Sequence, residues 1–289
     1  MQFNRTLLVV LERHDEHLTA LNRACLIAQR LGCQVKVLSW QPEADEENYQ
    51  PQSLQVLMQQ WQEQGVQLSL ELLNEPDLAE AVLRVQAQEQ AGLLVKECES
   101  RHTHLPWRSP ADWQLLRQCP CPVLLVKRDG VWQGGKVLAA IEAQPRDQRH
   151  AQLNQGVLAL ATFVTQAIEG QLHIVSAYPP PMQAGEPEDQ AEELLAARWQ
   201  QACEQLTAQA RPQPSAFHIG EGPAEHWIPQ VAAEQAANLV VLGTVGRAQF
   251  IGALLGNTAE RILDSLNADV MVLQPDSGLA ICTLLHPPG

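Results

Sequence analysis

Residues 237–246 read Ala-Asn-Leu-Val-Val-Leu-Gly-Thr-Val-Gly. A run of four large apolar residues that ends at a glycine is typical of a short strand buried on both faces and followed by a turn. Residues 91–95, Ala-Gly-Leu-Leu-Val, repeat this pattern in the first half of the chain. A second pair of similar apolar runs lies at residues 123–126 and 270–273. These matches predict that the chain contains two copies of one structural unit.

Short apolar strands alternate with amphipathic helices in both copies, and Glu12 and Glu142 each end a first strand. Asp77, with Glu80 three residues later, predicts a helix start with a capping box. Apolar residues recur at helical spacing before Gly32 and Gly170, which predicts helices that stop at these glycines. Strands are expected at residues 6–11, 35–40, 66–72, 92–96, 123–127, 136–141, 172–177, 216–219, 239–242 and 270–274. The predicted class is α/β and Rossmann-like, with two tandem parallel sheets covered by helices on both faces.

The short Gly-rich stretch 129–135 is the expected junction, giving domains at 1–130 and 131–289. The first half carries a net charge of −5 and the second −9, within a total of −14. Because phosphate binding needs a basic face, nucleic acid and anionic membrane surfaces are not expected partners. No apolar run is long enough for a transmembrane helix, and the run 7–11 is too short for a signal peptide. Seven cysteines without a disulfide-like spacing predict reduced thiols in a cytoplasmic protein.

A glycine-rich loop follows the strand at residues 239–242. Two residues separate Gly243 from Gly246, and nine more lead to Gly256, just before a predicted helix. Glycines permit close approach of the backbone, and a helix start offers free N–H groups to an anion, to which Arg247 adds charge. The alternative is that the loop only turns the chain and that its polar residues cap the helix.

This loop is not a Walker A motif, because no lysine follows its last glycine. The second half contains a single lysine, Lys136. A polar residue, Asn257, stands at the helix start, and Glu260 three residues later completes a capping-box pattern. The loop by itself therefore indicates a turn before a helix and gives only weak support to a phosphate site.

The pattern Gly-x-x-Gly, nine residues, Gly and a polar helix start, on an α/β unit of this size, resembles the universal stress protein family. Residues 109–123 also resemble the equivalent stretch of its tandem-domain members. The resemblance implies a five-stranded parallel sheet in each half and, for many members, binding of ATP together with Mg²⁺. Carried over by position, the nucleotide-binding residues are Glu142, Gly243, Thr244, Gly246, Gly256 and Asn257. The candidate ligand-binding residues also include Ala177, Arg247 and Thr258. Two departures are Glu142 in place of the usual aspartate and Asn257 in place of the usual serine or threonine.

The loop of the first half differs from that of the second. Residues 97–104 contain no glycine and include the carboxylates of Glu97 and Glu99, which repel phosphate. The first half is therefore predicted not to bind a nucleotide. Pro110 and Asp112 are interpreted as a structural helix start, with a proline at the first position and a carboxylate in the first turn.

Other polar residues receive a structural interpretation. His102 and His104 are more simply side chains of a solvated loop than zinc ligands, because a zinc site needs three or four ligands in suitable geometry. Cys119 and Cys121 do not form a CxxC motif and are expected to be buried thiols. The apolar segment 279–285 either covers a sheet edge or forms a loose tail, and the sequence leaves both open.

The leading hypothesis is a cytoplasmic stress-response protein of regulatory or protective type, which acts by binding. The second half would carry its ligand site, and the ligand would be ATP or another adenine nucleotide. The main alternative keeps the fold but replaces the nucleotide by an apolar or amphiphilic ligand or a regulatory protein partner. A weak nucleotide hydrolase ranks last, and an enzyme is not expected, because no general base, metal-ligand cluster or phosphate-binding lysine is evident.

The last strands of the two halves, at residues 123–127 and 270–274, are expected to be edge strands. Exposed strand edges are usually covered. The two halves are therefore expected to pair as an internal pseudo-dimer, and a homodimer of the whole chain is a further expectation.

Overall fold

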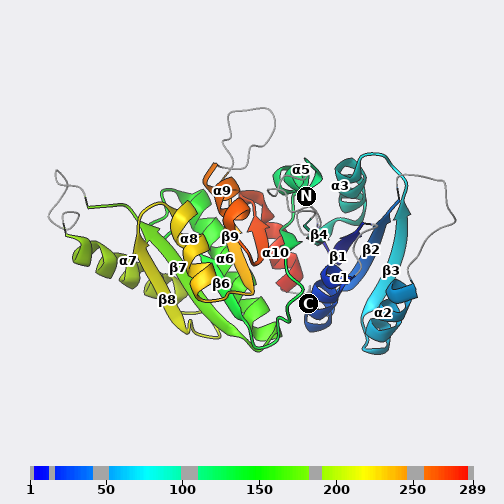
Figure 1. Ribbon diagram of the computed structural model, residues 1–289, viewed down its shortest axis with the longest axis horizontal. Helices are drawn as coiled ribbons and strands as arrows, with labels where there is room; N and C mark the ends of the chain where they lie inside the picture. The colour runs from blue at the N-terminus through cyan, green and yellow to red at the C-terminus, as the bar shows by residue number, and fades with distance from the viewer. Residues whose placement is uncertain are drawn as a thin grey trace. The chain divides into compact units, whose positions relative to one another are not determined.

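The computed structural model describes residues 3–12, 17–41, 52–98, 110–181, 191–245 and 257–285. The chain forms two compact units (Figure 1). Unit 1 comprises residues 1–129 together with 276–289, and unit 2 comprises residues 130–275. The sequence placed residues 276–289 in the second domain, but the structure places them in unit 1.

The packing of the C-terminal helix α10 (Gly278–Leu285) explains why this segment belongs to unit 1. It contacts β1 and β4 of unit 1 through its buried apolar residues Ala280, Ile281 and Leu284. The segment is thus a helix packed on two inner strands, which is neither of the two arrangements expected from its sequence. Its burial removes apolar surface of both the helix and the sheet from water, which stabilises the docked position.

Unit 1 contains a sheet of five parallel strands in the order β3-β2-β1-β4-β5. The strands are β1 (Asn4–Leu11), β2 (Gln34–Trp40), β3 (Gln67–Leu73), β4 (Ala91–Glu97) and β5 (Val123–Val126). The helices between them are α1 (Thr19–Leu31), α2 (Gln52–Glu63), α3 (Leu78–Glu89) and α5 (Pro110–Gln118).

Unit 2 repeats this topology in the order β10-β9-β6-β7-β8, again with parallel neighbours. Its strands are β6 (Lys136–Ala140), β7 (Gln171–Tyr178), β8 (Ala216–Glu221), β9 (Leu239–Gly243) and β10 (Asp269–Leu273). Its helices are α6 (Gln148–Ala167), α7 (Glu192–Thr207), α8 (Ala224–Glu234) and α9 (Asn257–Ser265). The prediction of two tandem five-stranded parallel sheets is confirmed.

The strand order reverses beside the first strand of each unit. Right-handed crossovers in opposite directions from that strand place helices on both faces of the sheet. Ligands of open parallel sheets bind where such an order reverses, beyond the carboxyl ends of the strands. The crevice to examine therefore lies at the ends of β1 and β4 in unit 1, and of β6 and β9 in unit 2.

Local sequence signals account for several helix ends. The carboxylate of Asp77 accepts the N–H of Glu80 at 2.9 Å, as the capping pattern predicted. Gly32 ends α1 with a left-handed φ of 64°. At the end of α6 the prediction was wrong in detail, because the left-handed residue is Glu169, with φ 52°. Gly170 is needed for another reason: a Cβ atom there would lie 2.2 Å from the carbonyl oxygen of Gly135.

Candidate functional site

Strand register makes the two crevices comparable residue by residue. Leu7 of β1 lies opposite Leu93 of β4, and Val137 of β6 lies opposite Leu239 of β9. Counting five residues along the first strand of each unit leads to Glu12 in unit 1 and Glu142 in unit 2. The two glutamates therefore occupy equivalent positions, as the sequence comparison had indicated.

The same register pairs the ends of the fourth strands. Lys96 and Glu97 close β4, and Leu242 and Gly243 stand at the corresponding positions of β9. Unit 1 thus has two charged side chains where unit 2 has a leucine and a glycine. The two crevices therefore differ in charge at these positions.

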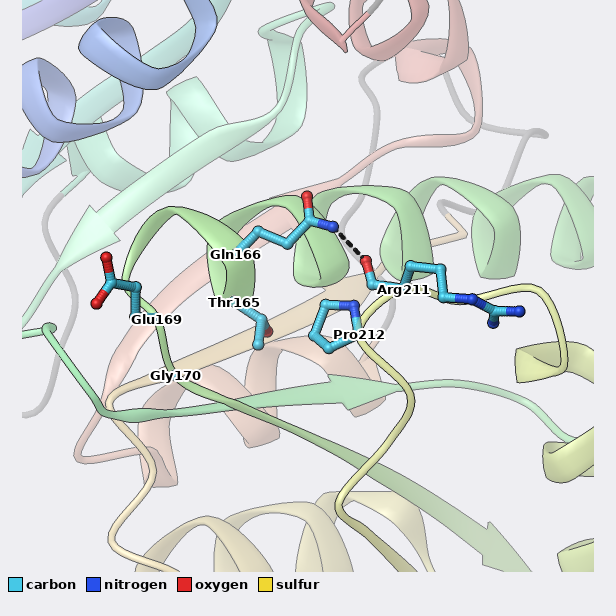
Figure 2. A pocket seen from close by; sticks show the side chains of 6 residues that line it. All are labelled: Thr165, Gln166, Glu169, Gly170, Arg211 and Pro212. Atoms are coloured by element: carbon cyan, nitrogen blue, oxygen red, sulfur yellow. Dashed lines mark hydrogen bonds between the residues drawn. The ribbon is translucent and has the colours of Figure 1, made fainter.

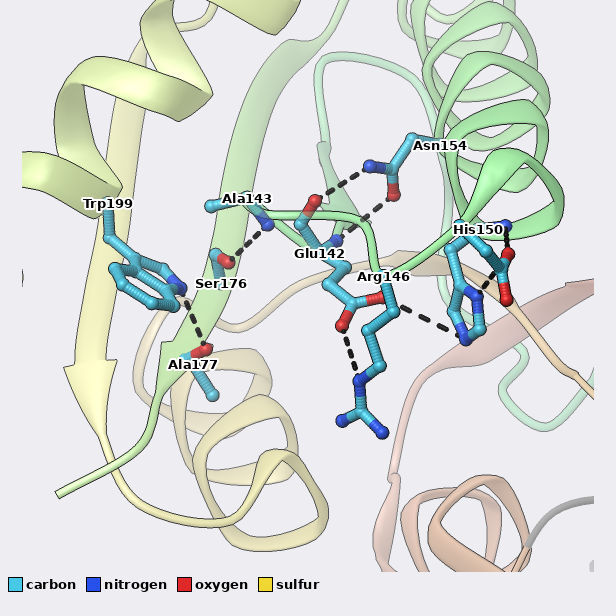
Figure 3. Close-up of polar contacts among 9 residues, drawn as sticks. Glu142, Ala143, Arg146, His150, Asn154, Ser176, Ala177 and Trp199 are labelled. Atoms are coloured by element: carbon cyan, nitrogen blue, oxygen red, sulfur yellow. Dashed lines mark hydrogen bonds and ion pairs between the residues drawn. The ribbon is translucent and has the colours of Figure 1, made fainter.

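In unit 2, Glu142 follows β6 and is fixed through both its backbone and its carboxylate (Figure 3). Its N–H donates to Oδ1 of Asn154 at 3.0 Å, and its carbonyl oxygen accepts Nδ2 of Asn154 at 2.7 Å. Its carboxylate lies 3.1 Å from Nε of Arg146 and 3.9 Å from Nε2 of His150. The Glu142 side chain remains 32% exposed and that of Arg146 81% exposed, so the ion pair faces solvent.

The start of α6 holds this group in place. Asp147 caps the helix by accepting the N–H of His150 at 3.0 Å, and its carboxylate also lies 2.8 Å from Nδ1 of the same imidazole. These hydrogen bonds from His150 lower the pKa of Asp147. The helix start therefore presents an imidazole, steadied by its own capping residue, beside the Glu142 carboxylate.

The neighbouring strand β7 ends at the same crevice. The N–H of Ala143 donates to Oγ of Ser176 at 3.3 Å, which ties the loop after β6 to β7. The carbonyl oxygen of Ala177 accepts Nε1 of Trp199, from α7, at 3.2 Å. Figure 3 shows both contacts on the side of Glu142 away from α6. Several main-chain polar groups at this edge are thus already hydrogen-bonded within the protein.

The glycine loop begins at the end of β9. A Cβ atom on Gly243 would come within 3.1 Å of Leu153 in α6, so the helix packs closely against this residue. Thr244 is buried, and its N–H donates to the carbonyl oxygen of Leu273 at 2.8 Å. Asn257 begins α9 and Thr258 is exposed beside it. The predicted binding residues Gly246, Arg247 and Gly256 lie outside the described residues.

The described part of the unit 2 crevice offers a ligand three polar groups of different charge. These are the half-exposed carboxylate of Glu142, the exposed guanidinium of Arg146 and the partly buried imidazole of His150. A carboxylate accepts hydrogen bonds from hydroxyl or amino groups, and a guanidinium binds phosphate or carboxylate. The set fits a polar ligand that carries both donors and negative charge, as a nucleotide does.

In unit 1, ion pairs connect residues on the two sides of the equivalent crevice. The side chain of Lys96 is fully buried, and its Nζ lies 2.5 Å from Glu12 and 2.9 Å from Asp112 of α5. The same Nζ donates to the carbonyl oxygen of Glu97 at 2.9 Å. Burial on its own lowers the pKa of Lys96, but the charges of Asp112 and Glu12 and their hydrogen bonds outweigh it and raise the pKa.

Glu97 makes the second contact across this crevice. Its carboxylate, 3% exposed, accepts the N–H of Ala20 in the first turn of α1 at 3.0 Å. The residue at the N-cap position of α1 is Leu18, which has φ 49° and makes no side-chain cap. Glu97 therefore supplies from β4 the negative charge that Asp147 supplies locally to α6.

A surface pocket of about 530 Å³ lies elsewhere, at the other end of the unit 2 sheet. Figure 2 shows Gln166 and Thr165 from the end of α6 facing Arg211 and Pro212. The amide of Gln166 donates to the carbonyl oxygen of Arg211 at 2.5 Å. Because this pocket adjoins the amino end of β7 rather than the carboxyl ends of the strands, it is separate from the crevice around Glu142.

Several other candidate residues have a structural role or cannot be placed. Cys119 and Cys121 are buried thiols as predicted, with their Sγ atoms 3.4 Å apart. His102 and His104 lie outside the described residues. Within the described ranges, no three histidine, cysteine or acidic side chains are grouped so that they could hold a metal ion.

Sequence analysis overlooked some residues that shape the two crevices. The sequence patterns assigned no role to Asn154 or Trp199, although Asn154 is a polar residue in a buried position. Lys96 was read as the end of a strand. A buried polar residue within an apolar pattern is the signal that identifies Asn154 and Lys96, because such a group needs a specific partner.

Comparison with known proteins places this geometry in a family. The model of the universal stress protein family matches residues 139–274. Universal stress protein E of Photorhabdus laumondii is 32% identical over 303 residues, covering 94% of this chain and 95% of that protein. Universal stress protein E of Escherichia coli K12 is 38% identical over 176 residues, covering 58% of this chain and 55% of that protein.

Solved structures give the same result. The crystal structure of a protein from Pseudomonas aeruginosa UCBPP-PA14, described as a universal stress protein, matches with a TM-score of 0.78 and 34% identity. That match covers 98% of this chain and 96% of the other. A universal stress protein from Archaeoglobus fulgidus has the same fold, with a TM-score of 0.64 at 16% identity over 94% of this chain and 99% of the other.

Across the described ranges, every helix is too short or too polar to cross a bilayer. The repeated sheet, the paired glutamates and the similarity along nearly the full length lead to one conclusion: this chain belongs to the universal stress protein family.

Proposed function

We propose that this chain is a cytoplasmic regulatory protein of the stress response that acts by binding a ligand in the crevice of unit 2. The main observation is the partly exposed carboxylate of Glu142 at the strand-order reversal, which pairs with Arg146. Asn154 holds the backbone of Glu142 in place through two hydrogen bonds. Crevices at such reversals are the usual ligand sites of open parallel sheets. The protein's role is binding rather than turnover.

The ligand that this crevice fits best is an adenine nucleotide bound with Mg²⁺. Ribose hydroxyls or the adenine amino group would donate to the Glu142 carboxylate, and the phosphates would extend toward Arg146 and the loop after Gly243. The proposed site consists of Glu142, Ala177, Gly243, Thr244, Gly246, Arg247, Gly256, Asn257 and Thr258. A divalent cation bound with the triphosphate would offset part of its charge beside the Glu142 carboxylate.

Calorimetric titration with Mg-ATP and Mg-ADP tests this proposal. The decisive variant is Glu142→Gln, which keeps the side-chain size but removes the negative charge. A hydrogen bond to a charged group contributes about 1.5–3 kcal/mol, so the variant is expected to bind about 10- to 150-fold more weakly. The matched control is Glu234→Gln, at the last residue of α8 and away from the crevice. Unchanged affinity in Glu142→Gln would place the site elsewhere.

A second candidate keeps the crevice but replaces the nucleotide by an amphiphilic ligand or a regulatory protein. The observation in its favour is that Asn154, Ser176 and Trp199 already satisfy main-chain polar groups at this edge. A ligand with few hydrogen-bonding groups has a smaller desolvation cost where the main-chain groups are already paired. Absence of heat with millimolar Mg-ATP, together with a co-purified amphiphile in the mass spectrum of the intact protein, would decide for this candidate.

A further inference from the structure

We propose that the crevice of unit 1 is occupied by the protein's own charged side chains, so that the chain takes one ligand, in unit 2 alone. This inference rests on the proposed function for its ligand stoichiometry. The occupancy of the unit 1 crevice by side chains stands on contacts within that unit.

The first contact is made by the ammonium group of Lys96, which takes the place of a ligand. Lys96 reaches from the end of β4 to Glu12 after β1 and to Asp112 in α5, at 2.5 and 2.9 Å. Together with the carbonyl oxygen of Glu97, the two carboxylates surround the ammonium group of Lys96. Glu12, the counterpart of Glu142, is therefore engaged by the protein itself.

The second contact is made by the carboxylate of Glu97 at the start of α1. The carboxylate of Glu97 accepts the N–H of Ala20, so it stands where a helix start would otherwise be open to a negatively charged group. The corresponding residue of unit 2 is Gly243, which has no side chain. Together, Lys96 and Glu97 connect β4 to the loop after β1, to α1 and to α5, and these connections run across the strand-order reversal.

At the corresponding described positions, unit 2 carries neither bridging group. The positions of Lys96 and Glu97 are taken by Leu242 and Gly243, and α6 is capped by its own Asp147. The carboxylate of Glu142 is consequently held by Arg146, which is 81% exposed, rather than by a buried lysine. An exposed pair of this kind separates at little cost, whereas a buried network does not.

Ligand stoichiometry gives the first test, with Mg-ATP as the probe on the full chain. The wild type is expected to bind one equivalent of Mg-ATP. Glu142→Gln weakens the site of unit 2, and it is expected to reveal no second site of higher affinity. Two results would overturn the inference. One is binding of two equivalents, and the other is binding at wild-type affinity in Glu142→Gln together with protection of unit 1 from hydrogen exchange. If the wild type binds no ATP, the proposed nucleotide function fails, and the second test still examines unit 1.

Hydrogen exchange measured by mass spectrometry gives that second test without any ligand. Glu97→Gln is expected to speed exchange in the first turn of α1 by about tenfold or more, because it weakens a charged cap, and to leave α6 unchanged. The matched control is Glu89→Gln, a carboxylate of the same unit that pairs with the partly exposed Lys36. Equal exchange in Glu97→Gln and wild type would contradict the inference.

A charge-balance series separates an ionic role of Lys96 from simple packing. Lys96→Met keeps most of the side-chain volume but removes the ammonium, and it is expected to loosen α1 and α5 in the exchange experiment. Neutralising its partners in the same chain, Lys96→Met/Glu12→Gln/Asp112→Asn, is expected to restore at least half of the lost protection. If the triple variant is no better protected than Lys96→Met, the network is not ionic and the inference fails.

Discussion

Leu284 of the C-terminal helix lies against Gly92 of β4, where a Cβ atom would come within 2.8 Å of its Cγ and Cδ2 atoms. Leu284 is 1% exposed. Residues separated by almost two hundred positions thus form one contact in the core of unit 1. The last residues of the chain complete the first unit, although unit 2 intervenes in the sequence.

Removal of this contact is expected to destabilise unit 1. Leu284→Ala should lower its free energy of unfolding by about 2–4 kcal/mol, as for other buried leucines. The control is Leu279→Ala in the same helix, where the side chain is 53% exposed, and its effect should stay within about 0.5 kcal/mol. Urea unfolding combined with hydrogen exchange of β1 and β4 measures both. If Leu284→Ala costs no more stability than the small loss expected for Leu279→Ala, the contact of Leu284 does not stabilise unit 1.

The same pair predicts a non-additive double variant. Gly92→Ala alone is expected to destabilise because its methyl group meets Leu284 and approaches the carbonyl oxygen of Asn4 at 3.2 Å. In Leu284→Ala that methyl group enters space the leucine has left. The double variant should therefore lose less stability than the two single variants together, by about 1 kcal/mol. Strict additivity in the double-mutant cycle would rule out direct contact.

A partly buried histidine pair in unit 2 predicts a loss of stability in acid. Nδ1 of His173 lies 3.0 Å from Nε2 of His218, and the two rings stack. Burial first, then the charges of His218 and Lys136, lowers the pKa of His173 to about 4. The pKa of His218 is lowered too, by burial and by Lys136, while Glu234 opposes this shift.

The direction in which stability changes with pH follows from proton uptake. Both imidazoles are neutral in the folded protein at neutral pH, whereas an unfolded histidine has a pKa of about 6.5. Their stabilising contribution is complete above that value and is lost as the pH falls below it, and for His173 the loss extends toward pH 4. For His173 the loss between pH 7.5 and 5 amounts to about 2 kcal/mol. His173→Phe should show a smaller loss in urea unfolding over this range, and an unchanged loss would contradict the assignment.

Thiol reactivity is expected to be confined to one cysteine. Cys282 is exposed, whereas the other six of the seven cysteines are buried. Burial raises the pKa of Cys25 to about 12 and that of Cys203 to about 11, which suppresses the reactive thiolate. An aromatic disulfide reagent should label one thiol per native chain and seven in denaturant. Cys282→Ser should abolish native labelling, and labelling of further thiols in that variant would show that the buried sites open.

The cap of α6 makes a separate prediction. Asp147→Ala is expected to lower the free energy of unfolding, because the N–H of His150 loses its acceptor. Asp147→Asn keeps a capping oxygen and should retain most of this stability. The pKa of Asp147 is lowered in the fold, so its ionic contribution is present at neutral pH and disappears as the pH falls through that pKa. Equal stability of the alanine and asparagine variants would exclude a capping role.

The sequence alone determined the features that depend on neighbouring residues. Apolar runs such as 239–242 predicted buried parallel strands, and Asp77 with Glu80 predicted a helix start that the structure contains. The repeat predicted that Glu12 and Glu142 are equivalent, and strand register agrees. These features are local because side-chain period and capping involve residues a few positions apart.

Only the tertiary structure decided how distant residues meet. The apolar segment 279–285 could have packed on many surfaces, and the small size of Gly92 makes room for it on β4. Lys96 has partners 84 positions before and 16 positions after it, which no local pattern reveals. Such contacts form only when the order of the strands brings their ends together. The sequence thus specified the two units, and the fold determined that one crevice is crossed by charges while the other remains bordered by an exposed ion pair.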